Sequence, residues 1–167
     1  MMNSAWIATG VILLVSVLFY LWLQQQDCKE VSVPWCGLDF TPRAGFEIVR
    51  LPGEPMMQTG CSRLVNGSIA EIEMHIAPDR TAWLRVAVDT DPARNIGRRS
   101  PIEFNTIHTS QVNGVKVHVY HTHGGPEMMN WRKNGFLYSL YMEHTEMTMM
   151  GGLIELFVRE SEARLNA

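Results

Sequence analysis

The sequence predicts an α+β protein in which an N-terminal transmembrane helix is followed by an antiparallel meander sheet that is covered by a C-terminal helix. Residues 5–23 contain no ionisable side chain and would span about 28 Å as a helix, which matches one hydrocarbon core. Three Asn-Gly dipeptides lie between runs with strand character, and residues 152–164 have the apolar spacing of a helix. These observations divide the 167-residue chain into a tail at 1–4, a transmembrane helix at 5–23, a juxtamembrane tether at 24–42 and an extracytoplasmic domain at 43–167.

The apolar run at 5–23 has Trp6 near one end and Trp22 near the other, where aromatic belts form at membrane surfaces. A cleaved signal peptide is one alternative, but residues 1–4 lack Lys and Arg, and residues 23–26 offer no small-residue cleavage site. A buried core helix is another, and such helices are rarely apolar on every face. We therefore expect a single-pass protein of the cell membrane, held in the lipid bilayer by residues 5–23, with its N-terminus in the cytoplasm and its C-terminal domain outside.

The charge of the chain limits the classes of partner. It has 14 Lys and Arg and 17 Asp and Glu, a net charge of −3, and these residues are interspersed after the apolar run. A surface of this kind gives no reason to expect nucleic acid as a partner. The residues after the apolar run are numerous enough for one domain with its own core.

The chain contains three cysteines, Cys28, Cys36 and Cys61. In an oxidising compartment an odd number leaves one free or intermolecular thiol. We predict a Cys36–Cys61 disulfide, because both residues belong with the folded domain whereas Cys28 follows the apolar run closely. In a cytosolic domain all three would stay reduced, and their spacing does not indicate zinc.

The Asn-Gly dipeptides at 66–67, 113–114 and 134–135 predict three two-residue hairpins, since a type I′ turn needs positive φ at both central positions. Each hairpin fixes a strand register. The third hairpin places Trp131 opposite Tyr138, a cross-strand aromatic pair.

Residues 69–76 alternate between apolar and polar side chains and predict a half-buried antiparallel strand. Residues 82–89 continue the apolar face, with Arg85 placed across from the acidic face of the neighbouring strand. The polar segment 90–101 then predicts a surface loop, although its three arginines could also bind an anion.

The chain closes on a predicted amphipathic helix at 152–164. Leu153, Leu156 and Phe157 follow the helical three and four spacing, while Glu155 and Arg159 fall on the opposite side. A helix of this length is marginal alone, so we expect its apolar stripe to pack on the sheet.

The hairpin that carries Trp131, Gly135 and Tyr138, together with the amphipathic helix that follows, resembles the extracytoplasmic domains of unknown function on single-pass bacterial envelope proteins, some of them linked to anti-sigma regulation. The resemblance covers about the last forty residues and the general strand order. It implies an outward-facing interaction or sensing module and supplies no catalytic residues.

Histidine and methionine gather in one region of the sequence. His121 and His123 follow a predicted strand, and Met129 comes shortly after them. Imidazole and thioether groups together are the ligand set for copper outside the cytoplasm, so these three residues are candidate copper ligands. The alternative is that methionine fills the gap between sheet and helix and that histidine ends a strand.

The sequence predicts a non-catalytic, membrane-anchored interaction or sensing module, or an accessory subunit of a membrane complex. No cofactor is expected, and the predicted partner is a membrane or envelope protein that binds the sheet face or the 90–101 loop. No nucleophile elbow, active-cysteine context or glycine-rich phosphate loop indicates an enzyme. A copper-binding protein outside the cytoplasm is the alternative.

Overall fold

The computed structural model describes residues 32–35, 37–52, 58–77, 80–91, 96–97, 104, 106–122, 125–143 and 147–166. A compact unit runs over Ser32–Ala167. It begins earlier than the boundary at residue 43, because the strand β1 (Ser32–Trp35), within the predicted tether, pairs with β3 (Gln58–Val65).

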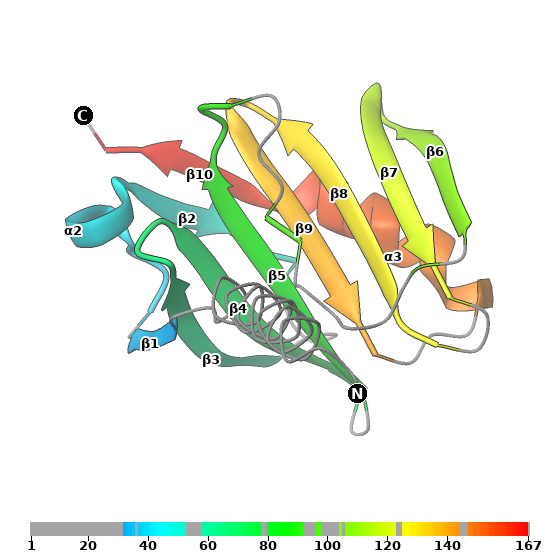
Figure 1. Ribbon diagram of the computed structural model, residues 1–167, viewed down its shortest axis with the longest axis horizontal. Helices are drawn as coiled ribbons and strands as arrows, with labels where there is room; N and C mark the ends of the chain where they lie inside the picture. Colours follow the sequence, from blue (N-terminus) through cyan, green and yellow to red (C-terminus); the bar gives the residue numbers. More distant parts are fainter. Residues whose placement is uncertain are drawn as a thin grey trace, which may run out of the picture. The chain divides into compact units, whose positions relative to one another are not determined.

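Eight strands form one antiparallel sheet in the order β1-β3-β4-β5-β9-β8-β7-β6 (Figure 1). The remaining bounds are β4 Ile69–Ala77, β5 Arg80–Val88, β6 Thr106–Val112, β7 Val115–His121, β8 Glu127–Lys133 and β9 Phe136–Met142. The sheet consists of two meanders, because β5 pairs with β9 rather than with β6, the next strand along the chain.

All three Asn-Gly turns are present, and those at 113–114 and 134–135 are confirmed as two-residue hairpins. At 66–67 the ladder pairs Val65 with Ile69, so the connection has three residues and the predicted two-residue loop is wrong there. Asn66, Asn113 and Asn134 have φ values of 49°, 49° and 52°, and each following glycine also has positive φ, as a type I′ turn requires. The register that follows the last turn places Trp131 opposite Tyr138, as predicted, and the same register places Met129 opposite Leu140. The ring planes of Trp131 and Tyr138 stack at 5.2 Å between centroids.

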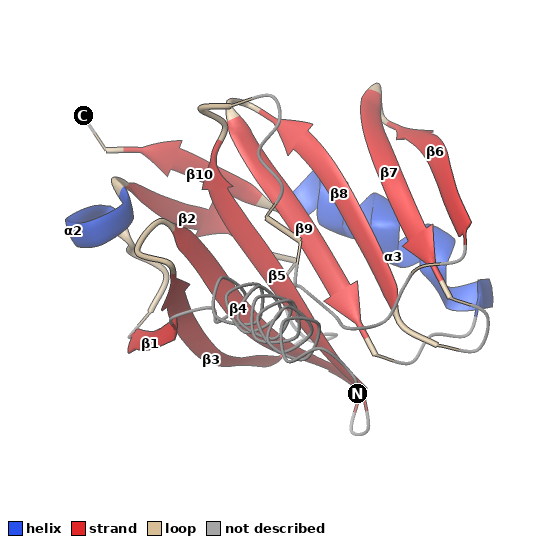
Figure 2. Cartoon of the chain, in the orientation of Figure 1, coloured by secondary structure: helices blue, strands red, loops and turns tan. Residues whose placement is uncertain are grey.

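Side chains alternate between two faces of the sheet, and one of these, here called the first face, forms the main core. Its members include Leu84, Tyr138 and Leu140, which cluster with Phe46 and Phe157 from the covering layer. That layer consists of α2 (Thr41–Ala44), β2 (Phe46–Arg50), α3 (Met147–Glu160) and β10 (Glu162–Leu165). In Figure 2 the longer helix passes behind the strands, and β10 pairs with β2 beside it.

The predicted α+β class is wrong. The part of the chain that the structure describes is mostly antiparallel sheet, with 63% strand and 13% helix. Two segments differ from the prediction: β1 lies within the predicted tether, and β10 replaces the end of the predicted C-terminal helix.

The prediction of a transmembrane helix is corrected as well. Among the residues that the structure describes, no helix is both long enough and apolar enough to cross a membrane. On this finding we do not retain the single-pass architecture or the placement in a cell membrane that depended on it. The stretch 5–23 itself lies outside the described residues.

The C-terminal helix has the predicted phase but different ends. Phe157 is fully buried, whereas Glu155 and Arg159 are exposed, as the apolar spacing indicated. The helix covers Met147–Glu160 rather than 152–164.

Lys133 marks where the helix ends. Its Nζ donates to the carbonyl oxygens of Val158, Arg159 and Ser161 at 2.8, 3.0 and 3.1 Å. An ammonium group at this position satisfies carbonyls that have no partner within a helix and complements the negative end of its dipole. The chain can then leave the helix and pair with β2.

Candidate functional site

A row of polar side chains crosses the second face of the sheet, the face opposite the main core. Consecutive members face each other across neighbouring strands, so all of them point to the same side. We call this set the polar row; its members are Arg63, Glu71, Arg85, Ser139, Asn130, His118 and Thr109. It runs from β3 to the outermost strand β6.

The Arg85–Glu71 end of the polar row is buried and fully engaged. Arg85 Nε donates to Glu71 Oε2 at 2.8 Å, and its Nη1 approaches the carbonyl oxygens of Ile96 and Gly97 at 3.4 and 3.3 Å. The guanidinium therefore ties residues 96–97 to the sheet. Its donors are occupied by the protein itself, so this end of the row is structural.

Ile96 reinforces that attachment from the segment 90–101, which the sequence predicted to be a solvated loop. Its side chain is buried and clusters with Val65, Ile69, Ala87 and Leu137 on the second face. The signal in the sequence was a single aliphatic residue within a polar stretch. The three arginines at 94, 98 and 99 lie outside the described residues.

The centre of the polar row has unsatisfied hydrogen-bonding capacity. Asn130 and Ser139 face each other across β8 and β9, and neither Asn130 Oδ1 nor Ser139 Oγ has a hydrogen-bond partner within the described part of the chain. Both atoms are shielded from solvent. A buried polar atom without a partner costs about 1–3 kcal/mol, so these two atoms require a functional or structural explanation.

The exposed end of the polar row lies on β6 and β7. Thr109 Oγ1 is 3.4 Å from His118 Nδ1, and His118 faces Asn130 across the next strand pair. Thr109 and His118, which solvent or a partner can reach, therefore lie next to Asn130, one of the two residues with an unsatisfied atom.

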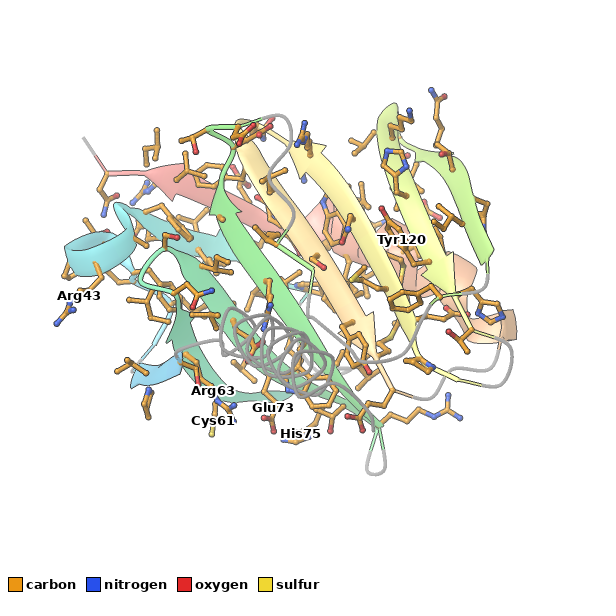
Figure 3. The ribbon with its side chains drawn as sticks, in the orientation of Figure 1. Arg43, Cys61, Arg63, Glu73, His75 and Tyr120 are labelled. Atoms are coloured by element: carbon orange, nitrogen blue, oxygen red, sulfur yellow. The ribbon has the colours of Figure 1, made fainter. Side chains whose placement is uncertain are left out.

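An apolar row runs beside the polar row on the same face. Its members, which face one another from β5 to β6, are Trp83, Tyr141, Met128, Tyr120 and Ile107. Trp83 and Tyr141 contact each other at 5.8 Å between ring centroids, and Phe104 lies at the same distance from Tyr120. Tyr120 is labelled on β7 in Figure 3. The apolar row is buried at Tyr141 and Met128 and becomes exposed at Ile107.

A second polar group lies across the sheet, on β3 and β4, where Figure 3 labels Cys61, Arg63, Glu73 and His75 close together. A Glu73 oxygen is 4.0 Å from Arg63 Nη2, and the other is 3.7 Å from His75 Nε2. These side chains are partly exposed, and surface ion pairs of this kind contribute at most about 1 kcal/mol. We read this group as a solvated surface.

The structure separates the predicted copper ligands. His121 lies opposite Glu127, with 2.5 Å between Nδ1 and Oε1, whereas Met129 lies opposite Val119 and is fully buried in the core. A five-residue connection over residues 124–128 would have placed His121 opposite Trp131. This expectation is wrong, because β8 begins at Glu127 and Trp131 pairs with Val117.

Metal binding has limited support from the described residues. His123 lies outside them, and within them no group of three His, Cys, Asp or Glu side chains could hold a metal ion. The three-residue copper site stays a prediction.

The predicted disulfide also stays a prediction. Cys61 is a free, exposed thiol on β3, and Cys36, like Cys28, lies outside the described residues.

Comparison of the chain with family models, with curated proteins and with solved structures finds no match. The resemblance to envelope-protein domains carried by Trp131, Gly135 and Tyr138 therefore stays a prediction.

Proposed function

We propose that this protein is a non-catalytic protein-binding module whose contact surface is the exposed end of the polar row together with the adjoining end of the apolar row. This surface contains Thr109, His118, Asn130, Tyr120 and Ile107. The observation that carries the proposal is the pair of shielded, unpartnered atoms Asn130 Oδ1 and Ser139 Oγ beside accessible side chains.

Hydrogen-bonding chemistry supports a partner at this position. Asn130 Oδ1 accepts a hydrogen bond, and the Ser139 hydroxyl can donate or accept one. A partner amide or hydroxyl that reaches these atoms would relieve the cost of two buried, unsatisfied groups. The isolated chain would lack that compensation, which makes the free surface the less stable state.

The apolar groups beside them support a protein as the partner. Tyr120 and Ile107 lie next to the polar groups, and Ile107 is 63% exposed. Protein interfaces combine aromatic and aliphatic contacts with a few well-placed hydrogen bonds, and tyrosine is enriched where the binding energy concentrates. The side chains of this surface are otherwise neutral, so a strongly charged partner such as nucleic acid fits less well.

Site-specific photocrosslinking tests the proposal. A photoreactive phenylalanine analogue replaces Tyr120, which is half-buried, in the full chain, and the same analogue replaces Leu165, a more accessible residue (60% exposed) on β10. We expect a discrete crosslinked protein from position 120 and none from position 165. Equal crosslinking at both positions, or none at position 120, would contradict the proposal.

The unsatisfied atoms provide a second test. Asn130→Leu removes the acceptor while filling similar volume, so it should weaken the crosslink at position 120 at least tenfold without destabilising the chain. Arg132→Leu, two residues beyond Asn130 on the same strand but outside the proposed surface, is the control and should leave the crosslink unchanged. A crosslink that survives Asn130→Leu would show that the unpartnered atoms do not bind the partner.

Copper binding is a second candidate function, favoured by the contact between His121 and Glu127. The Glu127 carboxylate lies beside Nδ1 rather than Nε2 of His121, and carboxylates in this position orient metal-ligating histidines in other proteins. Copper titration of the full chain and of its His121→Ala/His123→Ala variant separates the two functions. Stoichiometric binding that the variant loses would favour copper, and the absence of binding would remove this candidate.

A further inference from the structure

We propose that two copies of this chain associate through their β6 strands, forming one continuous antiparallel sheet across a two-fold axis at Thr109. This inference concerns the backbone edge of β6, whereas the proposed function concerns side chains on the face of the sheet. The two share Thr109 and Ile107, but sedimentation of the purified chain tests only the first and crosslinking to a partner tests only the second.

The two edges of the sheet differ in their protection. Strand β1 has only four residues and contains Pro34, which cannot donate a ladder hydrogen bond. Strand β6 has seven residues, TIHTSQV, with no proline, lysine, arginine or carboxylate. Short strands, prolines and charges are the usual means by which proteins block pairing at a sheet edge. By these criteria β1 is protected and β6 is open to pairing.

The hairpin between β6 and β7 determines which backbone groups point outward. Its two-residue turn makes Val112 and Val115 a hydrogen-bonded pair, and hydrogen-bonded and non-hydrogen-bonded pairs then alternate along the ladder. Ile107, Thr109 and Gln111 therefore belong to non-hydrogen-bonded pairs with β7. Their N–H and C=O groups point away from β7, toward the edge where no other described strand pairs.

These outward groups are self-complementary. An antiparallel copy of β6 placed with Thr109 opposite Thr109 puts Ile107 opposite Gln111 on both sides of the axis. In this register every outward N–H meets an outward C=O of the copy, because all three residues are of the same pairing class. The register also overlaps the full length of the strand.

The side chains are compatible with the same register. Thr–Thr pairs across antiparallel strands are favourable, and no like charges meet because β6 has none. Ile107, exposed in the single chain, would pack against the aliphatic part of the Gln111 side chain of the copy. These features favour a second copy of this chain over an unrelated strand, because β6 is complementary to its own antiparallel copy in both backbone groups and side chains.

A charge-swap experiment at the axis tests the dimer. The full chain is analysed by sedimentation at concentrations up to about 0.1 mM. We expect the wild-type chain to have about twice its single-chain mass of 19.0 kDa, and Thr109→Lys and Thr109→Asp each to remain a single chain, because like charges meet at the axis. An equimolar mixture of the two variants should restore the dimer.

Val33→Lys is the matched control. It adds the same charge to an exposed position on the opposite edge strand β1, so it should leave the dimer intact. A wild-type chain that remains single at every concentration would overturn the proposal. So would a dimer that persists in Thr109→Lys, or one that Val33→Lys disrupts equally. Restoration by mixing excludes misfolding of the two Thr109 variants as the cause of dissociation.

Discussion

The Arg85 guanidinium and the Glu71 carboxylate form a buried ion pair on the second face of the sheet. Both Nε and Nη2 of Arg85 lie 2.8 Å from Glu71 Oε2, and the two side chains are only 3% and 6% exposed. The pair joins two central strands, and through Ile96 and Gly97 it also fixes a segment of the following connection. Removing one partner would leave the other charge in a site that excludes water.

Glu71→Ala should therefore reduce the free energy of unfolding by about 3–5 kcal/mol, as expected when one partner of a buried ion pair is lost. Urea denaturation monitored by tryptophan fluorescence measures the change. Glu73→Ala, two residues along the same strand, is the control. Its partners are partly exposed, so it should cost at most about 1 kcal/mol.

The double variant Glu71→Leu/Arg85→Met separates charge burial from packing. It removes both charges and retains similar side-chain volume, so its loss of stability should be much smaller than that of Glu71→Ala. Equal losses would show that the cost comes from packing or from the bonds to residues 96–97 rather than from an uncompensated charge.

The sequence predicted the position of this pair but not its burial. Alternation in residues 69–76 and 82–89 placed Arg85 across from the acidic side of its neighbour, and the register confirms it. The same alternation implied that Glu71 faces water. What overrides it is Ile96, a residue distant from Glu71 in sequence that packs on the second face. The periodicity of a strand predicts which face of the sheet a residue occupies, but it does not predict whether a segment distant in sequence covers that face.

Tyr138 should make the stability of the protein decrease at alkaline pH. Burial raises the pKa of its phenol to about 12 from an ordinary value of 10.0. In the unfolded chain the phenol ionises near its ordinary pKa, so between these two values the folded state binds more protons than the unfolded state. The neutral phenol thus contributes at most about 3 kcal/mol to the free energy of unfolding. This contribution is fully present below pH 10 and is lost as the pH rises toward 12.

Tyr138→Phe is the matched control for this effect. It cannot ionise, so the alkaline loss of stability between the two pKa values should be smaller in this variant. Denaturation at a series of pH values measures the difference, and absorbance at tyrosinate wavelengths follows the ionisation directly. Parallel pH profiles for both chains would contradict the assignment to Tyr138.

Phe157 provides the test of helix packing. Its side chain is fully buried in the main core, between α3 and the first face of the sheet, so Phe157→Ala should cost about 3–5 kcal/mol. Glu155→Ala, on the exposed side of the same helix, should change the unfolding free energy by less than about 0.5 kcal/mol. Similar effects of the two substitutions in thermal denaturation would indicate that the helix does not contribute Phe157 to the core.

The end of this helix could not be predicted from its own residues. The apolar spacing continues beyond Glu160, and no glycine or proline follows to end it. Lys133, on a strand remote in sequence, binds the final carbonyl groups, and β10 finds its pairing partner in β2. Both interactions are tertiary, whereas the phase of the helix depends only on local spacing and was predicted correctly. The polar row also depends on tertiary structure, because its members come from seven strands whose order in the sheet cannot be read from the sequence.

The register between β1 and β3 gives a geometric reason for the predicted Cys36–Cys61 disulfide. Trp35 lies opposite Ser62, and Ser62 Oγ donates to the carbonyl oxygen of Gly37 at 3.0 Å. Cys36 itself lies outside the described residues, but both of its chain neighbours lie beside Ser62, the residue that follows Cys61. Opposed residues on antiparallel strands lie at Cα separations that a disulfide can bridge.

Under oxidising conditions the mass of the full chain should thus fall by that of two hydrogen atoms in mass spectrometry. Peptide mapping should recover residues 36 and 61 in one disulfide-linked fragment. Bridging these positions should raise the free energy of unfolding by about 3 kcal/mol over the reduced chain, through the lower entropy of the unfolded state. Cys28→Ser should preserve both effects, and Cys36→Ser should abolish both. A linked fragment that contains Cys28 in place of Cys36, or an exposed Cys61 that stays alkylatable after oxidation, would show that β1 does not bring the two thiols together.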